Sequence, residues 1–266
     1  MAKDKYILYH YEPSFGAAIA FVALFGVSAA LHIFQLARKR TWYFIPFVIG
    51  GLFETIGYIG RALNSKENYN EWTTGPYTMQ SLLLLLAPAL FAASIYMVLA
   101  RIIRLTDGEA HSLIKVKWLT KVFVMGDVIS FLAQSAGGGM LTQAKDNDGV
   151  KLGQNIIIGG LGIQVAVFGF FIIVSALFHI RIRRVPTQVS QSLHVPWEQF
   201  LFVLYAASCF IMIRSVFRIA EYVMGSDGAL LKNEVYLYVF DAGLMTLTTF
   251  LFNLRHPSAI IPNRQT

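Results

Sequence analysis

Seven runs of about 20 apolar residues follow one another along the 266-residue chain, and no other feature constrains its fold as strongly. A helix of about 20 apolar residues crosses a bilayer, and lipid offers the backbone no water to bond. We therefore predict an all-α, polytopic membrane protein, a bundle of seven transmembrane helices in a single domain over residues 1–266. The predicted spans are 14–37, 42–63, 77–101, 117–141, 154–181, 198–223 and 234–254.

Composition supports this class. The chain is 56% hydrophobic and 14% charged, with a mean hydropathy of +0.56, whereas an average soluble domain is about 25% charged. So few charges cannot cover a water-exposed surface, which excludes a soluble enzyme, a disordered chain and a nucleic-acid-binding domain. The single cysteine, Cys209, excludes an intramolecular disulfide.

The charges between the runs predict the direction of the chain. The loops after the first, third and fifth runs, with the C-terminal tail, carry thirteen Lys and Arg residues against three acids. The segments on the other side carry six basic and eight acidic residues. Because basic loops stay in the cytoplasm, we predict an outside N-terminus and a cytoplasmic C-terminus.

The remaining charges lie inside the runs, where each costs about 2.5–3.5 kcal/mol at mid-bilayer. The second run carries Glu54, Tyr58 and Arg61 on one helical face, and the sixth carries a similar stripe from Arg214 to Glu221. With the predicted direction, most of these groups share the outer half of the bilayer. We predict a polar cavity there, open to the outside or to the outer leaflet and closed towards the cytoplasm. Its candidate ligand-binding residues are Glu54, Tyr58, Arg61, Asp127, Gln134, Gln164, Arg214, Arg218, Glu221 and Asp241.

The four acids and three arginines inside the runs leave one carboxylate without a cation. Such a carboxylate either holds a proton or accepts a cationic head group. The alternative is a structural network, in which pairs such as Glu54–Arg61 hold helices together. No nucleophile motif and no metal-ligand spacing is present, so we expect no catalytic residue, metal, cofactor or enzymatic activity. The glycine runs at 137–139 and 159–162 indicate close helix packing.

Several stretches together carry a resemblance. They are Tyr11-Glu-Pro-Ser14, Gly51-Leu-Phe-Glu-Thr-Ile-Gly-Tyr-Ile-Gly-Arg61, Gln134-Ser-Ala-Gly-Gly-Gly139, Gly160-Leu-Gly-Ile-Gln164, Arg214-Ser-Val-Phe-Arg-Ile-Ala-Glu-Tyr222, Asp241 and His256-Pro257. The chain resembles the fungal lipid-translocating exporter family, also called RTA-like after resistance to aminocholesterol. The resemblance implies a seven-span protein of the plasma membrane, with an internal membrane as the alternative. It also implies relatives linked to sphingoid long-chain bases, amino-sterols and porphyrin uptake.

The resemblance and the charges together predict binding and translocation or export of an amphipathic lipid, with an amine-bearing head group. A seven-span lipid receptor or sensor is one alternative, and binding of haem or porphyrin through the three arginines is another. The expected partners are the membrane and a lipid or amphipathic small molecule, with no nucleic acid. The oligomeric state stays open.

Overall fold

A computed structural model describes residue 9 and residues 11–68, 71–144, 146–225 and 228–259. Within these residues the fold is all helical and no strand occurs, which confirms the predicted all-α class. The long helices are α1 (Phe15–Lys39), α2 (Ile45–Asn64), α3 (Thr74–Leu105), α4 (Val116–Gln143), α5 (Asn147–Arg184), α7 (Trp197–Met224) and α10 (Leu244–Leu254). Short elements connect them: η1 (Trp42–Phe44), η2 (Glu109–His111), α6 (Gln188–Ser192), α8 (Ala229–Lys232), α9 (Glu234–Leu237), η3 (Tyr238–Gly243) and η4 (Pro257–Ala259).

Six helical segments of the described chain are long and apolar enough to cross a membrane. They are Phe15–Lys39, Trp42–Asn64, Thr74–Leu105, Asp148–Arg184, Trp197–Met224 and Glu234–Ala259. The helix over the predicted fourth span, α4, is not among them, so the count of seven spans stays a prediction. The direction of the chain also stays a prediction; of the charges behind it, Lys3, Asp4, Lys5, Lys145, Asp227 and Arg264 lie outside the described residues.

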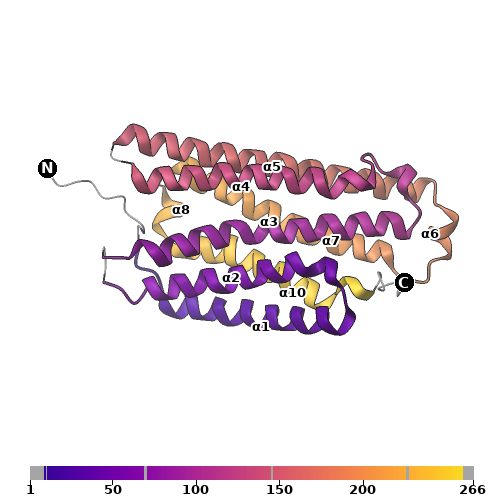
Figure 1. Ribbon diagram of the computed structural model, residues 1–266, viewed down its shortest axis with the longest axis horizontal. Coiled ribbons are helices and arrows are strands. Elements are labelled where there is room, and N and C mark those ends of the chain that lie inside the picture. Colours follow the sequence, from indigo (N-terminus) through magenta and orange to yellow (C-terminus); the bar gives the residue numbers. More distant parts are fainter. Residues whose placement is uncertain (1–8, 10, 69–70, 145, 226–227, 260–266) are drawn as a thin grey trace.

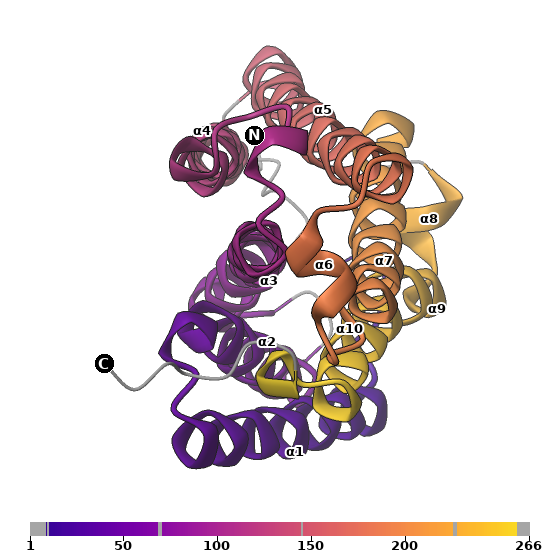
Figure 2. The same cartoon turned by 90° about the vertical axis from the view of Figure 1, so that its right-hand side faces the viewer.

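The long helices run up and down along one axis, with α8 at one end of the bundle and α6 at the other (Figure 1). We call these the α8 end and the α6 end; the α8 end is the predicted outer side. Seen along the axis, α3 lies towards the middle, between the α1–α2 pair and the α4–α5 pair, and faces α7 (Figure 2).

Local sequence explains the helix boundaries. Ser14 caps α1 by accepting a hydrogen bond from the backbone N–H of Ala17. At the other end Arg40 adopts a left-handed conformation, with φ of 52°, and Arg38 and Lys39 lie in the last turn, where cations suit the helix dipole. Together these signals stop α1 at the α6 end of the bundle.

The last predicted span is not one regular helix. The side chain of Asn233 caps α9, and a π-helical turn, η3, then carries Asp241 before α10 begins. A π-helical turn inserts an extra residue and often marks a functional position in a helix. Sequence periodicity alone predicts an unbroken helix over 234–254, and it misses this turn.

The α6 half of the bundle holds a close-packed aromatic core. The rings of Phe44 and Phe47 stack with centroids 4.5 Å apart, and Phe91 and Phe252 pack against Phe47. Aromatic pairs at such distances are favourable beyond the area that they bury. The middle of this half is therefore filled by aromatic rings, and the cavity that gathers buried charged residues lies towards the α8 end.

Candidate functional site

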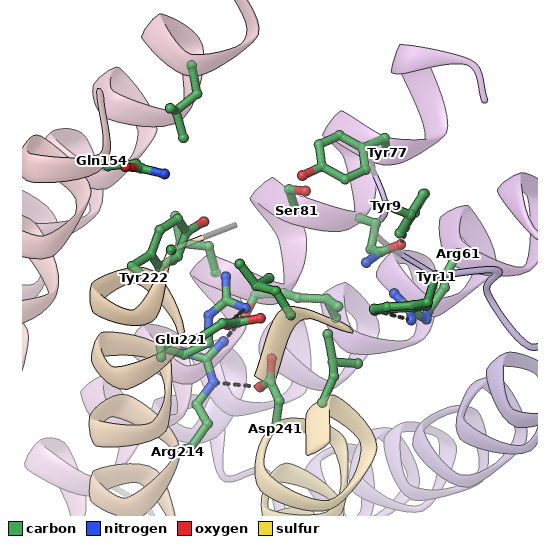
Figure 3. Close-up of a pocket in the computed structure, with 18 of the residues that line it drawn as sticks. Tyr9, Tyr11, Arg61, Tyr77, Ser81, Gln154, Arg214, Glu221, Tyr222 and Asp241 are labelled. Atoms are coloured by element: carbon green, nitrogen blue, oxygen red, sulfur yellow. Dashed lines mark hydrogen bonds and ion pairs between the residues drawn. The ribbon is translucent and has the colours of Figure 1, made fainter. Parts of the chain in front are cut away.

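A cavity of about 290 Å³ opens near the α8 end, between α3, α5, α7 and the start of the last span (Figure 3). Tyr77 and Ser81 of α3 face Tyr222 of α7 across it. Five of the ten predicted ligand-binding residues line it: Arg61, Arg214, Arg218, Glu221 and Asp241. The cavity thus gathers charged groups from α2, α7 and η3.

Arg214 is buried and bonds to two other helical elements. Its Nε donates to Oδ1 of Asp241 at 2.7 Å, and its Nη2 donates to the backbone carbonyl of Leu84 at 2.8 Å. That carbonyl is free because Pro88, four residues later in α3, has no N–H to donate to it. A proline inside α3 therefore creates the acceptor that ties Arg214 of α7 to α3.

A second ion pair lies within α7. Nη1 of Arg218 donates to Oε2 of Glu221 at 2.6 Å, and both side chains line the cavity. The spacing of three residues places the two groups on neighbouring turns of the helix. In the carboxylates of Glu221 and Asp241, one oxygen takes part in the ion pair, and the other has no hydrogen-bond partner among the described residues. Each acid therefore keeps one acceptor for a further donor.

Arg61 is fully buried, and its partner is Glu234, the first residue of the seventh predicted span, which the charge count places with the acids of the outer side. Its Nη2 donates to Oε1 of Glu234 at 2.7 Å and to the hydroxyl of Tyr11 at 2.7 Å. The rings of Tyr9, Tyr11 and Tyr238 surround the guanidinium, with centroids 5.3–5.5 Å from Cζ. Such distances favour cation–π attraction, so Arg61 joins α2, the N-terminal segment and the last span.

Tyr9 and Tyr11, which precede α1, line one side of the cavity. The hydroxyl of Tyr9 donates to Oε1 of Gln80 at 2.8 Å, and the ring packs edge-on against Trp72 and Tyr77. Burial raises the pKa of the Tyr9 and Tyr11 phenols, and this effect outweighs the opposing charge of Arg61. Both hydroxyls therefore stay protonated hydrogen-bonding groups at neutral pH.

Glu54 and Tyr58 lie on α2 but do not line the cavity. Both are buried, and Oε1 of Glu54 and the Tyr58 hydroxyl have no hydrogen-bond partner among the described residues. The Glu54–Arg61 pair of the structural alternative does not form, because Arg61 pairs with Glu234 instead.

The other predicted residues lie on the α4–α5 side. The hydroxyl of Tyr96 donates to Oδ2 of Asp127 at 3.0 Å, and Asp127 does not line the cavity. Nε2 of Gln134 donates to Oγ of Ser130 at 2.7 Å and to Oε1 of Gln164 at 3.1 Å. Gln164 also lies outside the cavity, whereas Gln134 lines a neighbouring one.

Sequence reasoning misses several residues that complete the site. Glu234 is missed because it is the first residue of its run and is counted with the charges of the outer side. Its predicted depth in the membrane equals that of Arg61, near the outer end of the second run, so a comparison of depths would have indicated the pair. Tyr222 directly follows Glu221 in one of the stretches that carry the resemblance. No signal other than the Tyr11-Glu-Pro-Ser14 stretch points to the N-terminal tyrosines.

No group of three or more His, Cys, Asp or Glu side chains that could hold a metal occurs among the residues with described positions. The arrangement instead offers carboxylate acceptors, hydroxyls and paired arginines beside Leu84, Leu85, Leu141 and Leu237. The lining therefore presents polar and apolar surface side by side.

Comparisons with known proteins identify the relatives of the chain. The family model described as RTA1 like protein matches residues 47–264. Protoporphyrin uptake protein 1 of Saccharomyces cerevisiae is 36% identical, over 94% of this chain and 91% of that protein. Protein RTA1 of the same yeast is 34% identical, over 97% and 87% of the two chains. The sphingoid long-chain base transporter RSB1 of the same species is 26% identical, over 96% and 74%.

No solved structure gives a significant match. The family match covers well over half of the chain, and two of these yeast relatives exceed 30% identity over nearly their whole length. The resemblance seen in the sequence is thereby confirmed. The protein is an integral, multi-pass membrane protein, and it belongs to the RTA1-like family.

Proposed function

We propose that the protein binds an amphipathic lipid with an amine-bearing head group in the cavity at the α8 end and moves it across the membrane. In this proposal the chain forms a single seven-span domain with its N-terminus outside, so that the cavity lies in the outer half of the bilayer. The names of its relatives support lipid transport in general: one is a sphingoid long-chain base transporter and another a probable lipid transporter.

The observation that supports an amine-bearing head group is the hydrogen bonding of Glu221 and Asp241. In each carboxylate one oxygen accepts a hydrogen bond from an arginine, and the other has no partner among the described residues. An ammonium group has three donors and no acceptor, so these two oxygens suit it. The hydroxyl of Ser81 lines the same cavity and suits a neighbouring hydroxyl of the ligand.

The size of the cavity fits a head group. Ligand pockets measure about 300–1,000 Å³, and this one, at about 290 Å³, is at the lower limit. The apolar part of a lipid therefore has to extend beyond it.

The test uses the purified full-length protein and a sphingoid base, haem and a phospholipid as probes. At a hundredfold excess over its dissociation constant, the sphingoid base is expected to stabilise the wild type by about 2.7 kcal/mol. Glu221→Gln and Asp241→Asn should remove this gain. Glu109→Gln, which changes an exposed acid at the α6 end, is the matched control and should keep it. Absence of stabilisation by the amine, or equal stabilisation of all variants, would overturn the amine proposal.

Transport and sensing share this binding result, and flux separates them. In liposomes that contain the wild type, a transporter accelerates movement of the sphingoid base between leaflets, and Glu221→Gln abolishes the acceleration. A receptor binds the base without accelerating its movement.

One observation favours a second ligand class. Arg61, Arg214 and Arg218 all line the cavity, and one relative is named a protoporphyrin uptake protein. A tetrapyrrole would place its carboxylates on these guanidiniums, which bind carboxylates in a fork geometry. Stabilisation by haem that Arg218→Gln removes, without any effect of the amine, would select this ligand.

A further inference from the structure

A second cavity, of about 190 Å³, lies beside the first, between α3, α4, α5 and α7. The two share part of their lining: Tyr77, Ser81, Leu85, Leu141, Arg218 and Tyr222. The shared residues belong to α3, α4 and α7, so a molecule held in the first cavity meets the second without crossing a helix. The second cavity extends from there towards α4.

The lining of the second cavity is charged where it meets the first cavity and mostly apolar on the far side. Among the described residues that line it, Arg218 is the one with a charge. The far side is formed by Leu82 of α3, by Gly138 and Gly139 of α4, and by Ile157 of α5. Leu82 is 40% exposed, and Gly138 is partly exposed. Leu82 belongs to a segment that is long and apolar enough to span a membrane, so in a bilayer its exposed side would lie against lipid at the edge of the second cavity.

The glycine run of α4 serves two different purposes. A side chain at Gly137 would meet the carbonyl of Gly153 at 2.7 Å, so this glycine permits the close contact of α4 with α5. A side chain at Gly138 would meet nothing within 4 Å. Helix packing explains Gly137 but not Gly138 or Gly139, which also has open space around it, and these two glycines line the cavity.

A buried polar group completes the far wall. Gln134 is 3% exposed and lines the second cavity, and its Oε1 has no hydrogen-bond partner among the described residues. A buried acceptor without a partner is unfavourable, so this oxygen suits a hydrogen-bond donor that a ligand brings into the second cavity.

We propose that the second cavity binds the apolar chain of the amphipathic ligand, which enters from the bilayer between α3 and α4. The inference rests on the proposed function, because the head group of the same molecule occupies the first cavity. The ligand is then held at two places, with its head group beside Glu221 and Asp241 and its apolar chain beside Leu82 and Ile157.

The test compares n-octylamine with n-hexadecylamine, two probes that share a head group and differ in chain length. Apparent dissociation constants come from ligand-dependent thermal stability of the full-length protein in one detergent. Each buried methylene contributes about fourfold in affinity. Gly138→Leu fills the space of at least two methylenes and should weaken n-hexadecylamine about tenfold, while n-octylamine changes less than about twofold.

Two further variants make the result specific. Gly159→Leu is the matched control, because a side chain there also meets nothing within 4 Å and the residue lines neither cavity. It should bind both amines as the wild type does. Leu82→Trp fills the second cavity from α3 and should repeat the effect of Gly138→Leu, which protects the test against a folding defect of the glycine variant. Partition of the amines into detergent affects all variants equally and cancels in their ratios.

The outcomes are distinguishable. If Gly138→Leu and Leu82→Trp bind both amines as the wild type does, the apolar-chain site is wrong and the head-group proposal stands. If both variants lose both amines to the same degree, the cavity does not discriminate chain length and the inference is again wrong. If neither amine stabilises the wild type, the proposed function fails and the inference fails with it.

Discussion

The ion pairs at the two ends of the bundle differ in length and in burial. At the α8 end, three pairs between largely buried side chains have N–O distances of 2.6–2.7 Å. At the α6 end, Arg104–Glu109 and Arg183–Glu198 are separated by 3.8–3.9 Å, and their side chains are 43–63% exposed. Exposed pairs contribute little, whereas removal of one partner from a buried pair leaves an uncompensated charge. Among the ion pairs of the described residues, those at the α8 end therefore contribute more to the structure than those at the α6 end.

This difference between the two ends explains how the cavity is kept open. The middle of the α6 half is filled by stacked rings, which need no specific partner. In the α8 half, Arg61 and Arg214 bond across helices to residues 173 and 27 positions away. These bonds hold polar side chains at the cavity wall instead of letting apolar ones collapse into it.

The largest expected effect separates the two ends directly. Arg214→Met leaves Asp241 buried without its cation, and we expect the free energy of unfolding to fall by about 3–5 kcal/mol. Arg183→Met removes an exposed pair and should cost less than about 1 kcal/mol. Denaturant unfolding of both variants in the same detergent measures the difference. Equal losses at the two ends would break the comparison.

The next prediction concerns the proline that frees the Leu84 carbonyl. In Pro88→Ala the new N–H can donate to this carbonyl, so Arg214 is no longer its only donor among the described residues. A double-mutant cycle should then show that Arg214→Met costs about 1–2 kcal/mol less in the Pro88→Ala background. The cycle of Pro88→Ala with Arg183→Met is the control and should be additive within about 0.5 kcal/mol. Additivity in both cycles would refute the link.

These examples show what sequence can predict here. The convergence of Arg214, Arg218 and Asp241 follows from helical spacing and from the shared depth of the sixth and seventh runs, both of which can be read from sequence. The partner of Arg61 could not be predicted in the same way, because a charge at the first residue of a run is easily assigned to the preceding loop. Placing Glu234 at its correct depth in the membrane would have indicated this pair.

Other features cannot be predicted without knowing how each helix is rotated about its own axis. A proline at position 88 predicts a free carbonyl at Leu84, but not that Arg214 of a distant helix reaches it. Glu54 shares a face of α2 with Arg61, yet it lies outside the cavity, because the residues that surround a face depend on the whole bundle. Three consecutive glycines likewise do not reveal which of them packs and which lines a cavity.

The smallest expected effect concerns the N-terminal segment, which is tied to the α8 end by neutral hydrogen bonds and by Arg61. Tyr9→Phe removes the hydrogen bond to Gln80 and should cost about 1 kcal/mol at neutral pH. Tyr236→Phe, which changes an exposed ring, is the control and should leave this stability unchanged.

The pH dependence sharpens this last prediction. Burial raises the pKa of Tyr9 in the folded protein, whereas the unfolded phenol titrates near pH 10. Above about pH 10 the unfolded state therefore loses a proton that the folded state keeps, and stability falls by up to about 1.4 kcal/mol per pH unit for this group. Tyr9→Phe removes this contribution, so its stability should fall less steeply than that of the wild type as pH rises beyond 10. Parallel slopes for the two proteins would mean that Tyr9 is not held inside the fold, and that the N-terminal segment does not line the cavity.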